Sequence, residues 1–137
     1  IKFYSANYSK EEIYQKFMNN SDVLIHPTYV ETFGVAVLDA LANGLGIITT
    51  DVYALPEMVK NGMNGIILKP PISIWDRYLP SIHYKNLSNL KMYIQTIDTK
   101  KFELELENSI LKFANNSVFK SKAQNYSKKI FMKDFKC

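Results

Sequence analysis

Four short apolar runs alternate with stretches of helical periodicity in the first half of the chain, and this alternation constrains the fold more than any other feature. The runs are Ile1–Tyr4, Asp22–Thr28, Gly46–Thr50 and Gly65–Leu68. The second and third are rich in β-branched residues, which is typical of strands buried on both faces. Strands separated by helices predict a parallel sheet that is covered by those helices.

Three helices are predicted between these runs. Ser9 and Glu12 form a capping-box pattern, which predicts a helix over about residues 10–19. Proline at a first-turn position predicts a short helix from Pro56 to about Lys60. The helix between them is indicated by an apolar stripe of Phe33, Val37, Leu38 and Leu41.

The character of the chain changes after residue 70. Prolines and aromatic residues predict a loop, and apolar faces then predict helices over about 86–97, 101–115 and 117–131. We expect 1–137 to be a single, partial nucleotide-sugar-binding domain. Its predicted parts are βα units, a loop and C-terminal helices, at 1–70, 71–85 and 86–137.

Composition excludes several classes of protein. With 137 residues, 47% of them hydrophobic and 22% charged, the chain resembles one globular domain and not a disordered or membrane-spanning protein. The single cysteine, Cys137, cannot form an internal disulfide, so we expect a cytoplasmic protein. The first residue is Ile1 and no signal peptide follows, so we expect a natural start upstream, or a processed or truncated chain.

The segment 26–44 carries the chemistry. It reads as a buried strand, a loop that ends in an acid, a glycine and a helix, which places a helix N-terminus beyond the carboxyl end of a parallel strand. The unpaired amides and the dipole of such an N-terminus suit a phosphate, and Gly34 allows a ligand to approach the backbone closely. Glu31 and Asp39 lie about 12 Å apart if measured along a helix axis, so they can bracket a bulky ligand.

Three blocks of sequence together resemble the C-terminal donor-binding domain of glycosyltransferase family 4, whose members are retaining enzymes with the GT-B fold. The blocks lie within 26–44, 46–51 and 55–65 and keep the family's order and spacing. The resemblance implies an α/β fold: a partial, doubly wound, Rossmann-like parallel sheet with helices on both faces, followed by C-terminal helices.

The resemblance also implies roles for individual residues. Glu31 contacts the transferred sugar and is the catalytic candidate, while Asp39 contacts the ribose of the donor. Thr32, Phe33, Gly34 and Val35 complete the donor site, with backbone amides near the diphosphate. The donor is a nucleotide-diphosphate sugar, and neither a metal nor another cofactor is implied.

Several positions depart from the family pattern. Asp39 replaces a glutamate, Gly46 stands where proline is usual, and Tyr53-Ala54 stand where glycines are common. The acceptor-binding half of the family, the first strands of its donor domain and its upstream Arg and Lys are not in this sequence. We therefore expect a gap or an exposed edge in the sheet, and either a longer polypeptide or an isolated chain that repacks or self-associates through that edge.

The expected function is the donor-binding part of an enzyme that transfers a sugar, with retention, to a glycan or lipid-linked acceptor, as in polysaccharide biosynthesis. The alternative is an inactive nucleotide-binding or interaction module. At the level of single residues, Glu31 and Glu57 also suit the start of a helix, and Asp39 also suits an exposed helix face.

Other residues support less specific interpretations. We expect a structural hydrogen bond from His26, and no metal site or catalytic triad around His83. Aromatic residues in the loop either pack it onto the domain or stack on a ligand; they are Trp75, Tyr78 and Tyr84. For the C-terminal lysines we expect either a solvated helix face or a peripheral contact with the inner face of a membrane. These lysines are Lys120, Lys122, Lys128, Lys129, Lys133 and Lys136. No nucleic-acid motif accompanies the net charge of +4.

Overall fold

The protein folds around a three-stranded parallel sheet. The computed structural model describes residues 2–4, 7–73, 75–76, 79–80 and 87–134. The strands are β1 (Val23–His26), β2 (Gly46–Thr50) and β3 (Gly65–Leu68), and they lie side by side in that order. Leu24 is opposite Ile47, and Ile48 is opposite Ile66. The predicted α/β class is confirmed.

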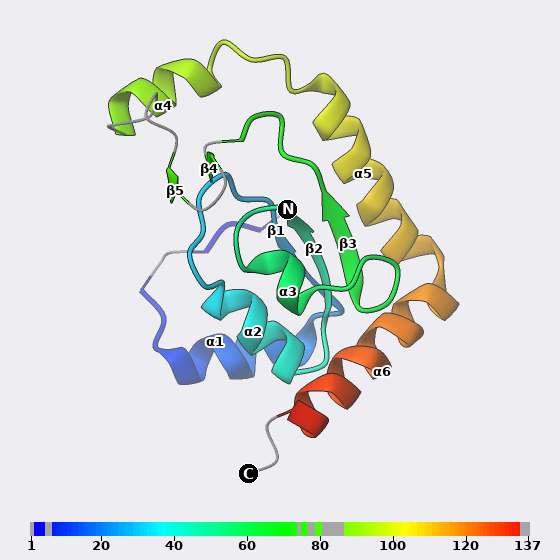
Figure 1. Cartoon of the computed structure of the whole chain (residues 1–137). Coiled ribbons are helices and arrows are strands. Elements are labelled where there is room, and N and C mark those ends of the chain that lie inside the picture. The colour runs from blue at the N-terminus through cyan, green and yellow to red at the C-terminus, as the bar shows by residue number, and fades with distance from the viewer. Residues whose placement is uncertain (1, 5–6, 74, 77–78, 81–86, 135–137) are drawn as a thin grey trace.

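Helices cover both faces of this sheet (Figure 1). Successive residues of β2 point to opposite faces, so Ile47 packs with α2 (Val35–Ala42) and α3 (Leu55–Met58) in one core cluster. Ile48 packs on the other face, against Phe113 and Ala123 of the two long helices. Those helices are α5 (Lys100–Asn115) and α6 (Ser117–Asp134). The fully buried strand β2 is therefore the centre of the core.

The first helix forms as the capping box predicts. The Ser9 hydroxyl accepts a hydrogen bond from the Glu12 amide at 3.2 Å, and the Glu12 carboxylate accepts one from the Ser9 amide at 2.9 Å. The helix is α1 (Lys10–Lys16), and a 3-10 turn, η1 (Met18–Asn20), follows it. A further helix, α4 (Leu87–Ile94), lies within the range predicted for it.

The predicted first strand is wrong for the residues that are described. Residues 2–4 adopt no strand, and Ile1 lies outside the described residues. Tyr4 instead packs its ring edge-on against Phe17, with 4.9 Å between the ring centroids, while Phe3 is 92% exposed. An apolar run becomes a strand when it pairs with another strand, whereas Tyr4 packs against Phe17, the residue that caps the end of α1.

Two further expectations need correction. The segment predicted as a loop contains a small antiparallel pair, β4 (Trp75–Asp76) and β5 (Leu79–Pro80). Strand β1 is not buried on both faces, because Ile25 is 41% exposed. Among the described strands β1 pairs with β2 alone, so it is an edge strand and its outer side lacks a neighbour.

Candidate functional site

Threonine side chains of β2 hold the start of the loop that follows β1. The Thr49 hydroxyl donates to the carbonyl oxygen of His26 at 3.0 Å. The Thr50 hydroxyl accepts from the Thr28 amide at 3.1 Å and donates to the Thr28 carbonyl oxygen. Both threonines are buried, so these contacts are shielded from water. The loop therefore leaves the carboxyl edge of the sheet from a fixed position.

Glu31 lies in this loop and is held through both carboxylate oxygens. Its Oε2 is 3.1 Å from Nε2 of His26, at the end of β1, and its Oε1 accepts from the Thr32 amide at 2.9 Å. About a quarter of each of the two side chains is exposed, 23% for Glu31 and 27% for His26. The structural hydrogen bond expected of His26 is confirmed, and its partner is the predicted catalytic residue.

These contacts determine the charge of Glu31. Partial burial raises the pKa of its carboxyl, but hydrogen bonds from His26 and from the amides of Thr32 and Gly34 outweigh burial, so the pKa lies below its ordinary value. An ionised carboxylate can only accept hydrogen bonds, so Nε2 of His26 carries the hydrogen that they share. Glu31 is thus a fixed anion at neutral pH, with lone pairs left over for a ligand.

The chain turns into α2 through Gly34, whose φ of +79° lies in the left-handed region. A Cβ atom at this position would lie 2.5 Å from Cδ2 of Leu55, so α3 packs directly against the turn. Within the described residues no side chain caps the N-terminus of α2. The start of α2 therefore presents backbone amides beside Glu31, as an anion site requires.

The helix begins at Val35 and not at Phe33, because the left-handed Gly34 precedes its first turn. Phe33 was predicted on the buried stripe, but it is 56% exposed, and Val35 is 58% exposed. Thr32 is also exposed and donates its amide to Glu31. Since residues 31–34 are not helical, the distance of about 12 Å along a helix axis does not describe the separation of Glu31 and Asp39.

Asp39 is held by another element. Lys10 and Tyr14 of α1 both contact its carboxylate: Nζ of Lys10 lies 4.0 Å from Oδ2, and a hydrogen bond to Asp39 raises the pKa of Tyr14. The Asp39 side chain is 26% exposed. The two predicted acids are therefore fixed separately, one by the end of β1 and the other by α1.

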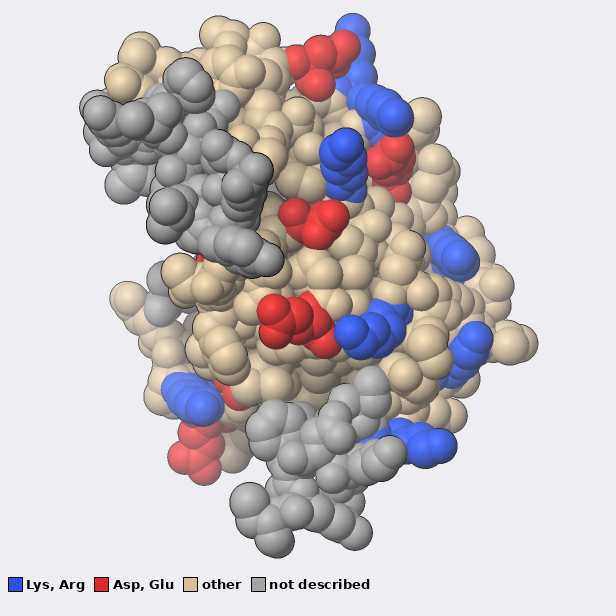
Figure 2. All heavy atoms as spheres, viewed as in Figure 1, with Lys and Arg blue, Asp and Glu red and all other residues tan. Residues whose placement is uncertain are grey.

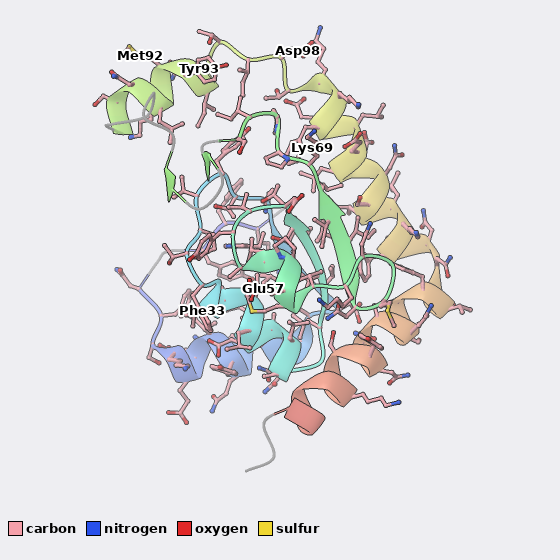
Figure 3. The ribbon with its side chains drawn as sticks, viewed as in Figure 1. Phe33, Glu57, Lys69, Met92, Tyr93 and Asp98 are labelled. Atoms are coloured by element: carbon pink, nitrogen blue, oxygen red, sulfur yellow. The ribbon has the colours of Figure 1, made fainter. Side chains whose placement is uncertain are left out.

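Figure 3 labels two side chains near the Gly34 turn: Phe33, just before α2, and Glu57 of α3. Glu57 is exposed in the first turn of α3, where a negative charge favours the helix. The aromatic candidates of the long loop cannot be placed, because Tyr78 and Tyr84 lie outside the described residues and only the backbone of Trp75 is described. His83 also lies outside them.

Two of the C-terminal lysines contact the body of the protein. Lys120 forms an ion pair with Asp22 at 3.2 Å, and the methylene groups of Lys128 pack close to Gly44. On the face shown in Figure 2, acidic and basic side chains are interspersed. No helix of the described chain is long and apolar enough to cross a membrane. Among the described residues, no three His, Cys, Asp or Glu side chains gather as metal ligands.

A cavity of about 240 Å³ lies between the end of β3 and the start of α5, away from the predicted residues. Lys69, Pro71, Asp98, Lys101, Phe102 and Glu105 line it, and Figure 3 labels Lys69 and Asp98. Lys101 and Glu105 pair at 4.0 Å, and Asp98 accepts from the Lys100 amide at 3.0 Å. Two of the charged side chains that line the cavity therefore pair with each other, and Asp98 is held by a backbone amide.

Sequence reasoning missed three parts of the site: the contact of His26 with Glu31, the threonine contacts of β2, and the hold of α1 on Asp39. His26 lies at the end of the apolar part of a predicted strand and precedes an acid by five residues, so their contact could have been proposed from spacing. The contacts of Thr49 and Thr50 could not be predicted without knowing that β1 pairs with β2. The contacts of Lys10 and Tyr14 with Asp39 could not be predicted without knowing that α1 lies beside α2.

Comparisons with known proteins agree on one family. A family model described as Glycosyl transferases group 1 matches residues 1–79. An uncharacterized glycosyltransferase of Methanocaldococcus jannaschii is 34% identical over 56 residues, which are 41% of this chain and 14% of that protein. The lipopolysaccharide glucosyltransferase WaaG of Escherichia coli is 29% identical over 73 residues, which are 53% of this chain and 18% of that protein. The chain therefore spans less than a fifth of the length of either relative.

Proposed function

This chain belongs to the group 1 glycosyltransferases, and from that premise we propose that its segment 26–39 holds the nucleotide-sugar donor of a retaining sugar transfer. The observation that carries the proposal is the state of Glu31. It is an oriented anion at the carboxyl edge of a parallel sheet, beside a helix N-terminus. That edge is where open α/β sheets bind their ligands.

In this proposal Glu31 accepts hydrogen bonds from hydroxyl groups of the transferred sugar. Its carboxylate already accepts hydrogen bonds from His26 and from the amides of Thr32 and Gly34, and a carboxylate has about four acceptor positions, so a position remains for a sugar hydroxyl. Because the contacts to His26 and Thr32 fix the carboxylate before the donor arrives, little conformational entropy is lost on binding. Glu31 acts as a fixed acceptor that orients the sugar.

The diphosphate of the donor lies on the backbone amides around Phe33, Gly34 and Val35. Negative charge grows on the departing nucleotide diphosphate during transfer, and amides held in place at a helix N-terminus stabilise that charge. The exposed Phe33 and Val35 leave this surface open to a ligand. In this proposal the reaction uses no metal and no cofactor besides the donor.

Asp39 contacts the ribose of the donor in the proposed arrangement. Its carboxylate is shared with α1, because Lys10 and Tyr14 also contact it. A carboxylate has about four acceptor positions, so a ribose hydroxyl can join these partners. Asp39 then couples the position of α1 to the donor.

The acceptor in this proposal is a glycan or a lipid-linked sugar, used on the cytoplasmic side of a membrane during polysaccharide synthesis. The name of the Escherichia coli relative, a lipopolysaccharide glucosyltransferase, supports an acceptor of this kind. Lysines of α6 that face solvent supply the membrane contact, among them Lys122 and Lys129. Co-sedimentation with anionic liposomes tests this part, and Lys122→Gln/Lys129→Gln should reduce the bound fraction.

Calorimetry with a panel of UDP-, GDP- and ADP-sugars tests the donor proposal. One nucleotide sugar should bind more tightly than its free nucleotide, because Glu31 contacts the sugar. Binding of the nucleotide alone, with no gain from the sugar, would remove that role from Glu31. If nothing in the panel binds, an interaction module explains the chain better. In a complete enzyme that contains this segment, Glu31→Ala should lower turnover.

A further inference from the structure

His26 lies where a side chain can be held rigidly. It is the last residue of β1, opposite Thr49 in the parallel ladder, and its carbonyl oxygen accepts from the Thr49 hydroxyl at 3.0 Å. Pro27 follows and restricts the backbone at the exit of the strand. The imidazole is therefore attached to the sheet, whereas Glu31 lies in the loop.

The carboxylate of Glu31 needs such a support. A glutamate side chain turns about three bonds, and a loop residue has few neighbours to restrict it. The contact with the Thr32 amide fixes Oε1, but Thr32 is the next residue of the same loop. The contact at 3.1 Å with Nε2 of His26 fixes Oε2 to the sheet. Together they set the plane of the carboxylate.

We infer that His26 is a positioning residue, which holds the Glu31 carboxylate in the orientation that accepts hydrogen bonds from the transferred sugar. The inference rests on the proposed function, since Glu31 must contact the donor for its orientation to matter. In the described part of the chain, His26 is the titratable side chain that donates a hydrogen bond to Glu31 and lowers its pKa. Its removal therefore leaves the carboxylate with the amides of Thr32 and Gly34, which belong to the same loop, and without a contact to the sheet.

The experiment compares two substitutions at His26. In His26→Gln the side-chain amide reaches about as far as Nε2 and can still donate to Glu31, whereas His26→Leu cannot donate. His26→Asn is a second disrupting variant, because its amide is too short to reach Oε2, and it replaces the leucine variant if that does not fold.

Carbon-13 NMR titration of the Glu31 carboxyl is the first measurement, and it needs no ligand. His26→Leu should move the pKa of Glu31 upward, since a hydrogen bond to the ionised form is lost. His26→Gln, the matched control that can still donate, should leave it near that of the parent chain. An unchanged Glu31 titration in both His26→Leu and His26→Asn would overturn the inference.

Affinity for the nucleotide sugar that binds best is the second measurement. His26→Leu should weaken it by about tenfold, and His26→Gln should restore most of the loss. Equal affinity of the parent and the leucine variant would also overturn the inference. A parent chain that binds no donor contradicts the proposed function, and the Glu31 titration then decides by itself whether His26 positions the carboxylate.

Discussion

Glu31 is held by contacts that act on its ionised form, and this gives folding a dependence on pH. Its pKa in the folded chain is lowered from the ordinary value of 4.5, because the hydrogen bonds outweigh burial. A lowered folded pKa contributes stability that is fully present above the ordinary pKa. That stability is lost as the pH falls through the folded pKa.

We predict that Glu31→Gln is less stable than the parent chain by about 1 kcal/mol at about pH 7. The difference should shrink as the pH falls below the ordinary pKa of 4.5. Urea unfolding of both chains at a series of pH values measures this difference, and other carboxyl groups cancel in the comparison. A difference that does not change with pH would show that the contacts do not favour the ionised form.

Gly34 supplies a turn that other residues cannot adopt without strain. Gly34→Ala places a methyl group 2.5 Å from Leu55 Cδ2 at a φ of +79°, so we predict a loss of about 3 kcal/mol in the free energy of unfolding. Gly62→Ala is the matched control. Its φ is +76°, but no described atom lies within 4 Å of the added methyl group.

The control should lose about 1 kcal/mol, the cost of the backbone conformation alone. Thermal or urea unfolding of both variants measures the two losses. Equal losses in Gly34→Ala and Gly62→Ala would mean that the turn is not packed against α3.

Sequence patterns identified candidate site residues, but they did not predict most of the contacts that hold these residues in place. The order of a strand, an acid, a glycine and a helix is local, so Glu31 and Gly34 could be chosen from the sequence alone. The contact of Glu31 with His26 depends on the path of the loop. The contacts of α1 with Asp39 depend on how two helices lie against each other, and a local sequence pattern does not predict that arrangement.

At the scale of elements, β2 and α5 meet at one glycine. A Cβ at Gly46 would lie 2.3 Å from the Phe113 ring, and the Gly46 amide donates to the Asp22 carbonyl oxygen at 3.0 Å. Proline, which is usual here in the family that the sequence resembles, would lose that hydrogen bond and meet the ring. The glycine at position 46, where the family usually has proline, therefore leaves the space that the Phe113 ring of α5 occupies.

We predict that Gly46→Ala and Phe113→Leu are not additive. Each variant alone should destabilise the fold, the first by overpacking and the second by leaving a gap. Together they should cost at least about 1 kcal/mol less than their sum, because leucine makes room for the methyl group. A double-mutant cycle in urea measures the coupling, and strict additivity would mean that the two positions do not share this contact.

Elements were predicted best where the sequence pattern is distinctive. Strand β2 and helix α5 agree closely with the prediction, because β2 is a short β-branched run that begins at a glycine and α5 has the apolar periodicity of a long amphipathic helix. Phe3 and Tyr4 are aromatic, like many strand residues, but residues 2–4 form no strand and Tyr4 packs against Phe17 at the end of α1. Phe33 has the spacing of the helical stripe, but the left-handed Gly34 separates it from α2, which begins at Val35.

At the scale of the whole molecule, β1 forms one edge of the described sheet. Its outer side has no partner among the described strands, and Ile25 on this strand is 41% exposed. An edge strand of this kind is a template for pairing with another chain.

We therefore predict that the average mass of the chain increases with concentration in light scattering. Ile25→Lys, which places a charge on the edge, should reduce the increase. A mass that stays at 15.8 kDa at every concentration would contradict this prediction.

The central claim is that a nucleotide sugar binds at the start of α2 through Glu31. Titration of the nitrogen-15-labelled chain with UDP-, GDP- and ADP-sugars tests it most directly, because the shifts of backbone amide signals locate the ligand. One member should shift the amides of Thr32, Phe33, Gly34 and Val35 in a saturable way, and Glu31→Gln should weaken its binding at least tenfold. Shifts centred on the cavity lined by Lys69 and Asp98, or no shifts with any member, would contradict the claim.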